Sequence, residues 1–112
     1  MEIYLVLIKR GEIMVRGTTP ELIFTLPFEV SSIQKLWITF SQKNSEIFTL
    51  EKEVCTLDGT EVRVSLTQEQ TLQFSSNCIL EIQMRVLTLD NVALASNIIR
   101  TSVQKILKGG VI

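Results

Sequence analysis

The sequence has no histidine, only two cysteines and two prolines, and almost no excess of either charge. Without histidine it lacks the commonest general base and the commonest transition-metal ligand, so no histidine-based catalytic triad can form. Eleven basic and twelve acidic side chains give a net charge of -1. The basic residues are scattered, whereas binding to nucleic acid or to an anionic membrane draws on concentrated cations. We expect no nucleic-acid partner and no membrane partner.

The two cysteines, Cys55 and Cys78, are too few for a disulfide framework and too far apart for a CxxC zinc or redox site. We expect both to lie in strands as small apolar side chains with free thiols.

The sequence also lacks a long apolar run. Residues 3–8 (IYLVLI) are preceded by an acid and followed by bases, which is the reverse of a secretory signal. A membrane helix would need about 20 apolar residues. We therefore expect the protein to be cytoplasmic when it is synthesised.

No remaining motif predicts catalysis. The two aspartates, Asp58 and Asp90, fall in predicted turns, where aspartate is favoured for backbone reasons. The glycines of RGTTP and LKGGVI lack the spacing of a phosphate-binding loop. We expect a protein that is not an enzyme, with no catalytic residue, no cofactor, no metal and no small-molecule substrate.

What the sequence does contain is alternation of apolar and polar residues. In ELIFTLPF, Leu22, Phe24 and Leu26 fall on one side, with Phe28, while Ile23 and Pro27 fall on the other. This period of two predicts a strand. Because Pro27 cannot donate to a ladder, the strand should lie at a sheet edge or end there.

The stretch LWITF places Leu36, Ile38 and Phe40 on one face and Trp37 on the other. Trp37 is the residue that could mark a contact surface. The alternative is that Trp37 covers the rim of the core or packs under a loop, since tryptophan is amphipathic and only sometimes an interface anchor.

A hairpin follows, with Asp58 and Gly59 as its turn and Val62, Val64 and Leu66 facing inward. Beyond it, Thr67 and Gln70 resemble a capping box. We expect one short helical turn that carries Leu72 and Phe74 onto an open end of the core.

The longest β pattern places Leu80, Ile82, Met84 and Val86 inside and Arg85 among the outward residues, before a turn at 90–91. The segment after Ser96 is ambiguous, because its apolar residues also fit a helical stripe that ends near Gly109. Its β-branched content favours a strand to about Val103.

With 46% hydrophobic residues in 112, the chain predicts a single globular domain. Short strands separated by turn signals predict an all-β antiparallel sandwich of about seven strands with one short helical turn.

The order of these segments resembles a family of short all-β proteins encoded in phages and prophages of Gram-positive bacteria. The resemblance rests on RGTTPELIFTLPF, LWITF, TLDGTEVRVSLTQEQTLQF, EIQMRVLTLDNVALASNII and VQKILKGGVI. The pattern is also similar to the N-terminal immunoglobulin-like domain of phage baseplate upper proteins. It implies an immunoglobulin-like sandwich that is a structural or accessory virion protein, associated with the tail or baseplate.

The resemblance implies protein partners, either copies of the same chain or other virion proteins, and a location in the virion after assembly. Such assembly requires an exposed strand edge or an apolar patch. The candidate interaction residues are Trp37, on its outward face, and Pro27 and Ile23, on the strand expected near an edge.

Two other functions stay open at this point. One is a carbohydrate-binding sandwich with Trp37 as a stacking platform, although aromatics make up only 6% of the chain. The other is a small intracellular prophage factor that binds a host protein.

The start of the domain is a separate question, raised by Met14 in KRGEIM. Codons AAA AGG GGA GAA are an allowed choice before this methionine, and they have the purine-rich character of a bacterial ribosome-binding site. We therefore expect residues 1–13 to be a non-domain extension and residues 14–112 to be the domain. The alternative is that the first residues form an extra edge strand.

Overall fold

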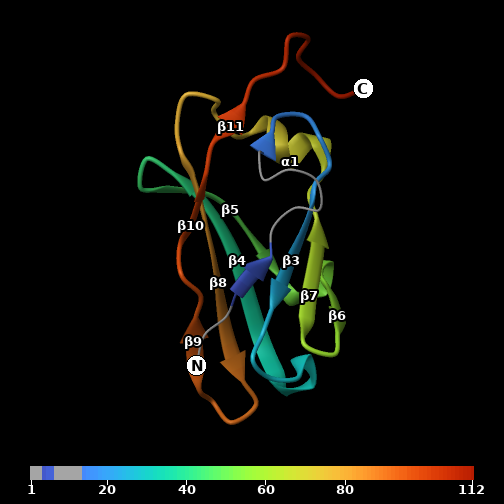
Figure 1. Cartoon of the computed structure of the whole chain (residues 1–112), viewed down its shortest axis with the longest axis vertical. Helices are drawn as coiled ribbons and strands as arrows, with labels where there is room; N and C mark the ends of the chain where they lie inside the picture. Colours follow the sequence, from blue (N-terminus) through green and yellow to red (C-terminus); the bar gives the residue numbers. More distant parts are fainter. Residues whose placement is uncertain (1–3, 7–13) are drawn as a thin grey trace.

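The computed structural model describes residues 4–6 and 14–112. In these residues eleven short strands form two packed sheets and a small additional pair, accompanied by one α-helix and two 3₁₀ turns (Figure 1). The all-β antiparallel sandwich predicted from the alternation is confirmed. The strand count exceeds seven because the first and last strands are divided into short pieces and the second sheet has one extra strand.

The first sheet has four strands in the order β1-β3-β7-β6, all antiparallel. Their bounds are Tyr4–Val6 for β1, Glu21–Thr25 for β3, Glu61–Ser65 for β7 and Thr56–Asp58 for β6.

The second sheet has five strands in the order β10-β8-β4-β5, with β9 pairing to another part of β8. Their bounds are Ile99–Thr101 for β10, Leu80–Thr88 for β8, Ile33–Gln42 for β4, Ser45–Glu51 for β5 and Ala93–Ala95 for β9. The two orders match the immunoglobulin-like arrangement, in which strands A, B, E and D oppose strands G, F and C with one extra strand beside C.

Three further short elements join these sheets. The 3₁₀ turns Val30–Ser32 and Lys52–Val54 connect strands of one sheet to strands of the other. At one end of the sandwich, β2 (Met14–Val15) pairs in parallel with β11 (Val103–Gln104).

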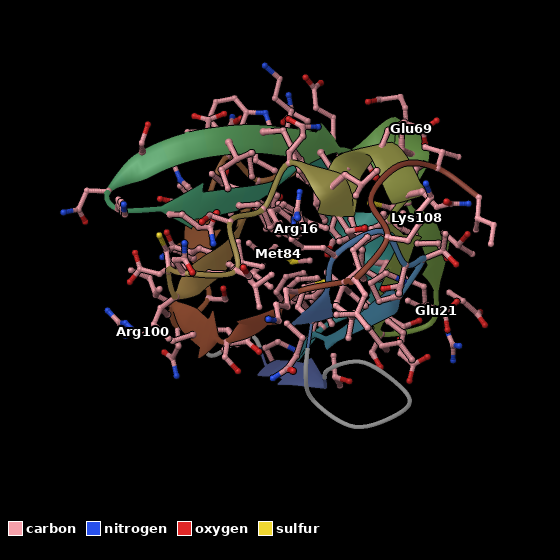
Figure 2. The ribbon with its side chains drawn as sticks, turned by 90° about the horizontal axis from the view of Figure 1, so that it is seen from above. Arg16, Glu21, Glu69, Met84, Arg100 and Lys108 are labelled. Carbon is pink, nitrogen blue, oxygen red and sulfur yellow. The ribbon has the colours of Figure 1, made fainter. Side chains whose placement is uncertain are left out.

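The core lies between the two sheets and contains the residues predicted to face inward. Every second side chain is buried in β8, in β3, in β7 and in β4 from Leu36 onward, where β4 has passed its register shift. Figure 2 looks down on the end of the sandwich and shows Met84 in this interior, whereas Arg100 projects from the outside. The alternation therefore determines which side chains lie on the two outer faces as well as which lie in the core.

The short helix α1 (Gln68–Leu72) closes one end of the sandwich. Its capping box is present: the Gln70 amide donates to the Thr67 hydroxyl at 3.1 Å, and the Thr67 amide donates to Gln70 Oε1 at 2.8 Å. Phe74, just after the helix, lies in the core as predicted, whereas Leu72 is only half-buried.

The strand with Pro27 does not lie at an edge of its sheet. Strand β3 is flanked by β1 and β7, and it ends at Thr25, two residues before the proline. Of the two expectations for this strand, the edge position is wrong and the early end is right. Pro27 itself lies exposed in the loop that follows.

The cysteines do not lie in strands, which corrects another expectation. Cys55 follows the 3₁₀ turn just before β6, and Cys78 lies in the loop before β8. Alternation predicted strands there, but a turn and a loop interrupt the ladders. Both thiols are free and partly buried.

Turns and the chain end agree with the strand interpretation. The hairpin turn lies one residue later than expected, at Gly59 and Thr60, because Asp58 still pairs with Glu61 across the ladder. Gly59 has a φ of +60°, which glycine adopts without steric cost. The segment after Ser96 continues as β10 and β11, so the helical alternative is wrong.

The boundary expected at Met14 stays a prediction. Residues 1–3 and 7–13 lie outside the described part of the chain, while β1 pairs with β3 in the register Tyr4 to Thr25. Met14 itself is fully buried.

Candidate functional site

Trp37 lies on the outer face of the five-stranded sheet, at the centre of strand β4. Its neighbours Leu36 and Ile38 point inward and are buried, so alternation forces the indole outward, where 45% of the residue is exposed. Among the side chains that the structure describes, Trp37 is the only exposed large aromatic. The prediction that it faces away from the core is correct.

Arg85, on the adjacent strand β8, is the direct neighbour of Trp37 in the register. Its guanidinium carbon lies 5.4 Å from the centre of the indole ring, which is a cation–π distance. Lys35 lies on the same face two residues earlier. Within the described part of the chain, no carboxylate forms an ion pair with Lys35 or with Arg85.

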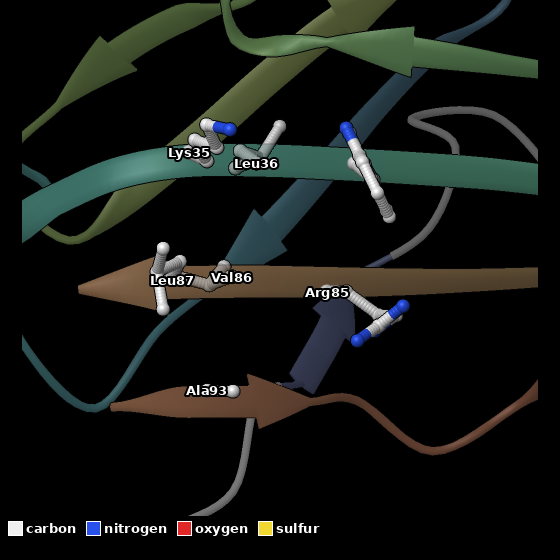
Figure 3. A pocket seen from close by; sticks show the side chains of 7 residues that line it. Lys35, Leu36, Arg85, Val86, Leu87 and Ala93 are labelled. Atoms are coloured by element: carbon white, nitrogen blue, oxygen red, sulfur yellow. The ribbon is translucent and has the colours of Figure 1, made fainter. Parts of the chain in front are cut away.

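A shallow hollow of about 240 Å³ lies beside these groups (Figure 3). It is lined by Lys35, Leu36, Trp37, Arg85, Val86, Leu87 and Ala93. The lining combines two cations with aliphatic and aromatic surface. Such a surface suits a partner that places carboxylates or polar acceptors beside an apolar group.

The other end of the same face carries hydrogen-bonded polar groups. The hydroxyls of Thr39 and Thr49 are 3.0 Å apart, and Thr49 donates to Glu46 Oε2 at 2.6 Å. On the far edge, Arg100 pairs with Glu81 at 3.0 Å. Lys35 and Arg85, which form no ion pair among the described residues, are therefore at one end of the face, and Glu46 and Glu81 lie at the other.

We call this surface the Trp37 face, and it consists of the outward residues of β5, β4, β8, β9 and β10. Its members are Glu46, Thr49 and Glu51; Lys35, Trp37, Thr39 and Ser41; Glu81, Gln83, Arg85 and Leu87; and Ala93, Ala95 and Arg100. Glu51, opposite Trp37 on β5, is the one carboxylate near the cationic end.

Pro27 and Ile23 do not join Trp37 in one site. Ile23 alternates with the buried Leu22 and Phe24, so it lies half-buried on the outer face of the other sheet. Pro27 is in the loop beyond that strand. Ile23 and Trp37 thus lie on opposite outer faces of the sandwich, and Pro27 belongs to neither face.

Strand edges of the described chain are poorly suited to strand addition. Strands β1, β6, β9 and β10 each contain only three residues. The seven-residue edge strand β5 is interrupted by a register shift at Phe40/Ser41, which places Ile47 as an extra residue. Short edges and bulges both hinder pairing with another strand, so a face is the more suitable contact surface.

Sequence reasoning identified Trp37 and the outward direction of Arg85, but it did not place them together. Alternation gives the face of each residue, whereas the register between strands sets which residues are neighbours. In the described residues there is no group of three His, Cys, Asp or Glu side chains that could hold a metal. No helix in the described part is long and apolar enough to cross a membrane.

Comparison with known proteins gives support only at the level of fold. No model of a protein family matches this sequence, and no curated protein matches it. Among solved structures, a crystal structure of an engineered protein is similar, with a TM-score of 0.53 and 12% identity. The likeness covers 95% of this chain and 20% of that protein, so this chain corresponds to one fifth of its length.

Proposed function

We propose that this protein is a non-enzymatic structural or accessory protein of a phage or prophage virion, associated with the tail or baseplate. It acts by protein-protein contact. The observation that carries the contact role is the Trp37 face, where an exposed tryptophan and two cations that form no ion pair within the described residues lie on the outer side of the five-stranded sheet. The phage origin rests on the sequence resemblance described above.

The composition of this face supports a contact role. Tryptophan and arginine are the residues most often found at the energetic centre of protein interfaces. Here Trp37 and Arg85 lie side by side on two central strands, so each is held in place by pairing on both sides. A rigid surface loses little conformational freedom when it binds, which favours affinity.

We also propose where the protein is located and which partners it has. The protein is synthesised in the cytoplasm and enters the virion during assembly. Its partners are copies of itself or other virion proteins.

Mass spectrometry of particles purified from a lysogen that encodes this chain tests the proposal. We expect the wild-type protein in the particles and the Trp37→Ala variant reduced at least tenfold. Ser65→Ala is the matched control, because Ser65 is exposed on the outer side of the other sheet and should be incorporated normally. Particles that lack the wild-type protein, with all of it left in the soluble lysate, would contradict the virion role.

A carbohydrate-binding function is the second candidate, favoured by the exposed indole beside a hollow. Against it, the described side chains supply no second exposed aromatic, and Arg85 already stacks near the ring. A glycan array with wild type and Trp37→Ala separates the two candidates. Binding that disappears with the tryptophan would favour the carbohydrate function.

A further inference from the structure

We infer that the Trp37 face binds the same face of a second copy, in a dimer whose two-fold axis runs parallel to the strands between β4 and β8. The inference rests on the proposed function and deepens it, because it names the partner as this chain itself. It follows from the arrangement of side chains on the face.

The two copies meet through their sheet faces and not through their strand edges. The edges of the described chain are short or bulged, so growth of a sheet by edge pairing is hindered. Two sheets can instead stack face to face at about 10 Å, with their strands nearly aligned. From Lys35 to Gln42, strand β4 pairs with β8 without a register shift, so this part of the Trp37 face offers a sheet surface for such stacking.

The two-fold axis determines which residues of the two copies face each other at the centre of the contact. The axis lays β4 of one copy over β8 of the other, at the same height along the strands. Trp37 then faces Arg85 of the second copy, and Arg85 faces the Trp37 of that copy. Two cation–π contacts between the chains then add to the one that each chain already contains.

The residues on both sides of Trp37 also face residues of the second copy. Lys35 faces Leu87 of the second copy, so the aliphatic stem of the lysine covers an apolar side chain. In the other direction Thr39 faces Gln83, and both can donate and accept hydrogen bonds. Charges of like sign do not meet in any of these pairs.

Charged side chains at the rim of the contact decide how the two copies are oriented. Strand β5 of one copy lies over β10 of the other, so Glu46 faces Arg100 of the second copy and Arg100 faces its Glu46. Glu46 is held on this face by its bond from Thr49, and Arg100 by its pair with Glu81. Two symmetric ion pairs result.

A two-fold axis perpendicular to the strands gives a worse match. It lays each strand over itself in the opposite direction, so that Leu87 faces the carboxylate of Glu81 and Trp37 faces Thr39. Arg85 then meets Gln83 instead of the indole ring, and Glu46 no longer lies opposite Arg100 of the second copy. The parallel axis is therefore the one that the charges favour.

The size of the face sets the strength of the dimer. Four strands at about 4.8 Å spacing and six residues at about 3.4 Å give roughly 400 Å² of flat surface per copy. A standard interface buries about 800 Å² of accessible surface per partner, so the dimer is reversible and concentration-dependent.

Sedimentation velocity on the purified full chain, over a concentration series, tests this arrangement by charge exchange. We expect wild type to dimerise, Glu46→Arg and Arg100→Glu each to weaken the dimer at least about tenfold, and the double variant to recover most of the loss. Circular dichroism checks that each variant is folded. Arg63→Glu, a charge reversal on the opposite face, is the matched control and should dimerise like wild type.

Trp37 emission in the wild-type chain provides a measurement that needs no variant. Acrylamide quenching should fall at least twofold as concentration drives dimerisation, because the indole becomes buried. A wild-type chain that is monomeric at every concentration, a quenching rate that does not change, or a double variant no tighter than the singles overturns the dimer. A monomer that still enters particles leaves the virion function intact, whereas a dimer absent from particles contradicts only the virion function.

Discussion

The two outer faces of the sandwich treat their charges differently. On the four-stranded sheet, Arg63 lies 2.6 Å from Glu61 and 3.8 Å from Glu21, so its charge is matched within the chain. On the five-stranded sheet, Arg85 lies over Trp37, and Lys35 has no ion pair in the described residues. On one face the central arginine is paired with carboxylates, and on the other the central cations form no ion pair within the described residues.

The difference cannot come from strand propensity, because both faces follow the same alternation. It comes from what the register brings together: β7 places Arg63 beside β3, which supplies Glu21, whereas β8 places Arg85 beside the tryptophan of β4. The contrast supports the proposed contact role of the Trp37 face, whose central cations lie around an exposed aromatic ring and form no ion pair within the described residues.

Removing the ring of Phe40 should have the largest effect, because both faces depend on one core. Phe40 is fully buried, with ring centres 4.8 Å from Phe48 and 5.8 Å from Phe74. We expect Phe40→Ala to lower the free energy of unfolding by about 3 to 5 kcal/mol. Urea denaturation followed by Trp37 emission and by far-UV circular dichroism should give coincident midpoints that shift together. An emission transition well before the dichroism transition would show that the two sheets unfold separately.

Much of this core was predictable from the sequence because a strand's period of two is strict. Leu22, Phe24, Ile38, Met84 and Val86 were assigned inward by alternation alone, and all are buried. The capping box at Thr67 was also local, since its donor and acceptor lie three residues apart. Features that depend on neighbouring residues in the sequence are the ones that sequence reasoning recovers.

The edge position of β3 and the strand positions of the cysteines were predicted wrongly because they depend on residues that are distant in the sequence. Pro27 indicates that a ladder stops, but it does not say whether another strand covers the preceding residues, as β1 does. The contact of Trp37 with Arg85, 48 residues apart in the numbering of the sequence, depends on the β4-β8 register. Pairing between distant strands is set by the packing of the whole sandwich.

Charge reversals at Arg85 and Arg63 compare the two faces directly. Arg85→Glu should weaken self-association at least tenfold, about 1.4 kcal/mol, because the cation over Trp37 of either copy is lost. Arg63→Glu should leave self-association unchanged while lowering the melting temperature, because it gathers three carboxylates on the four-stranded sheet. Sedimentation velocity measures the first effect and thermal unfolding in low and high salt measures the second. Equal loss of association in both variants would remove the distinction between the faces.

The helix cap tests a region where the two sheets meet and should affect both faces equally. Thr67→Ala removes the acceptor of the Gln70 amide and should lower the free energy of unfolding by about 1 kcal/mol. Thr67→Ser keeps a hydroxyl and is the matched control. Urea denaturation should show the same shift by emission and by dichroism, with dimerisation unchanged. A change in dimerisation would mean that α1 belongs to the contact surface.

Cys55 tests the connection between the two sheets, just before β6, with the smallest expected effect. Burial, followed by the nearby charge of Glu53, raises the pKa of its thiol from 9.0 to about 11. The folded chain therefore holds this proton at pH values where the unfolded chain has lost it. The stability contributed by the protonated thiol is fully present below pH 9 and is lost as the pH rises toward 11. Alkylation rates of a Cys78→Ser variant, measured against pH, report the titration of Cys55 alone, and Glu53→Gln should shift that titration slightly downward. A Cys55 thiol with a pKa near 9 in the folded chain would show that the segment between β5 and β6 is open to water. It would also show that this segment does not pack against the core between the two sheets.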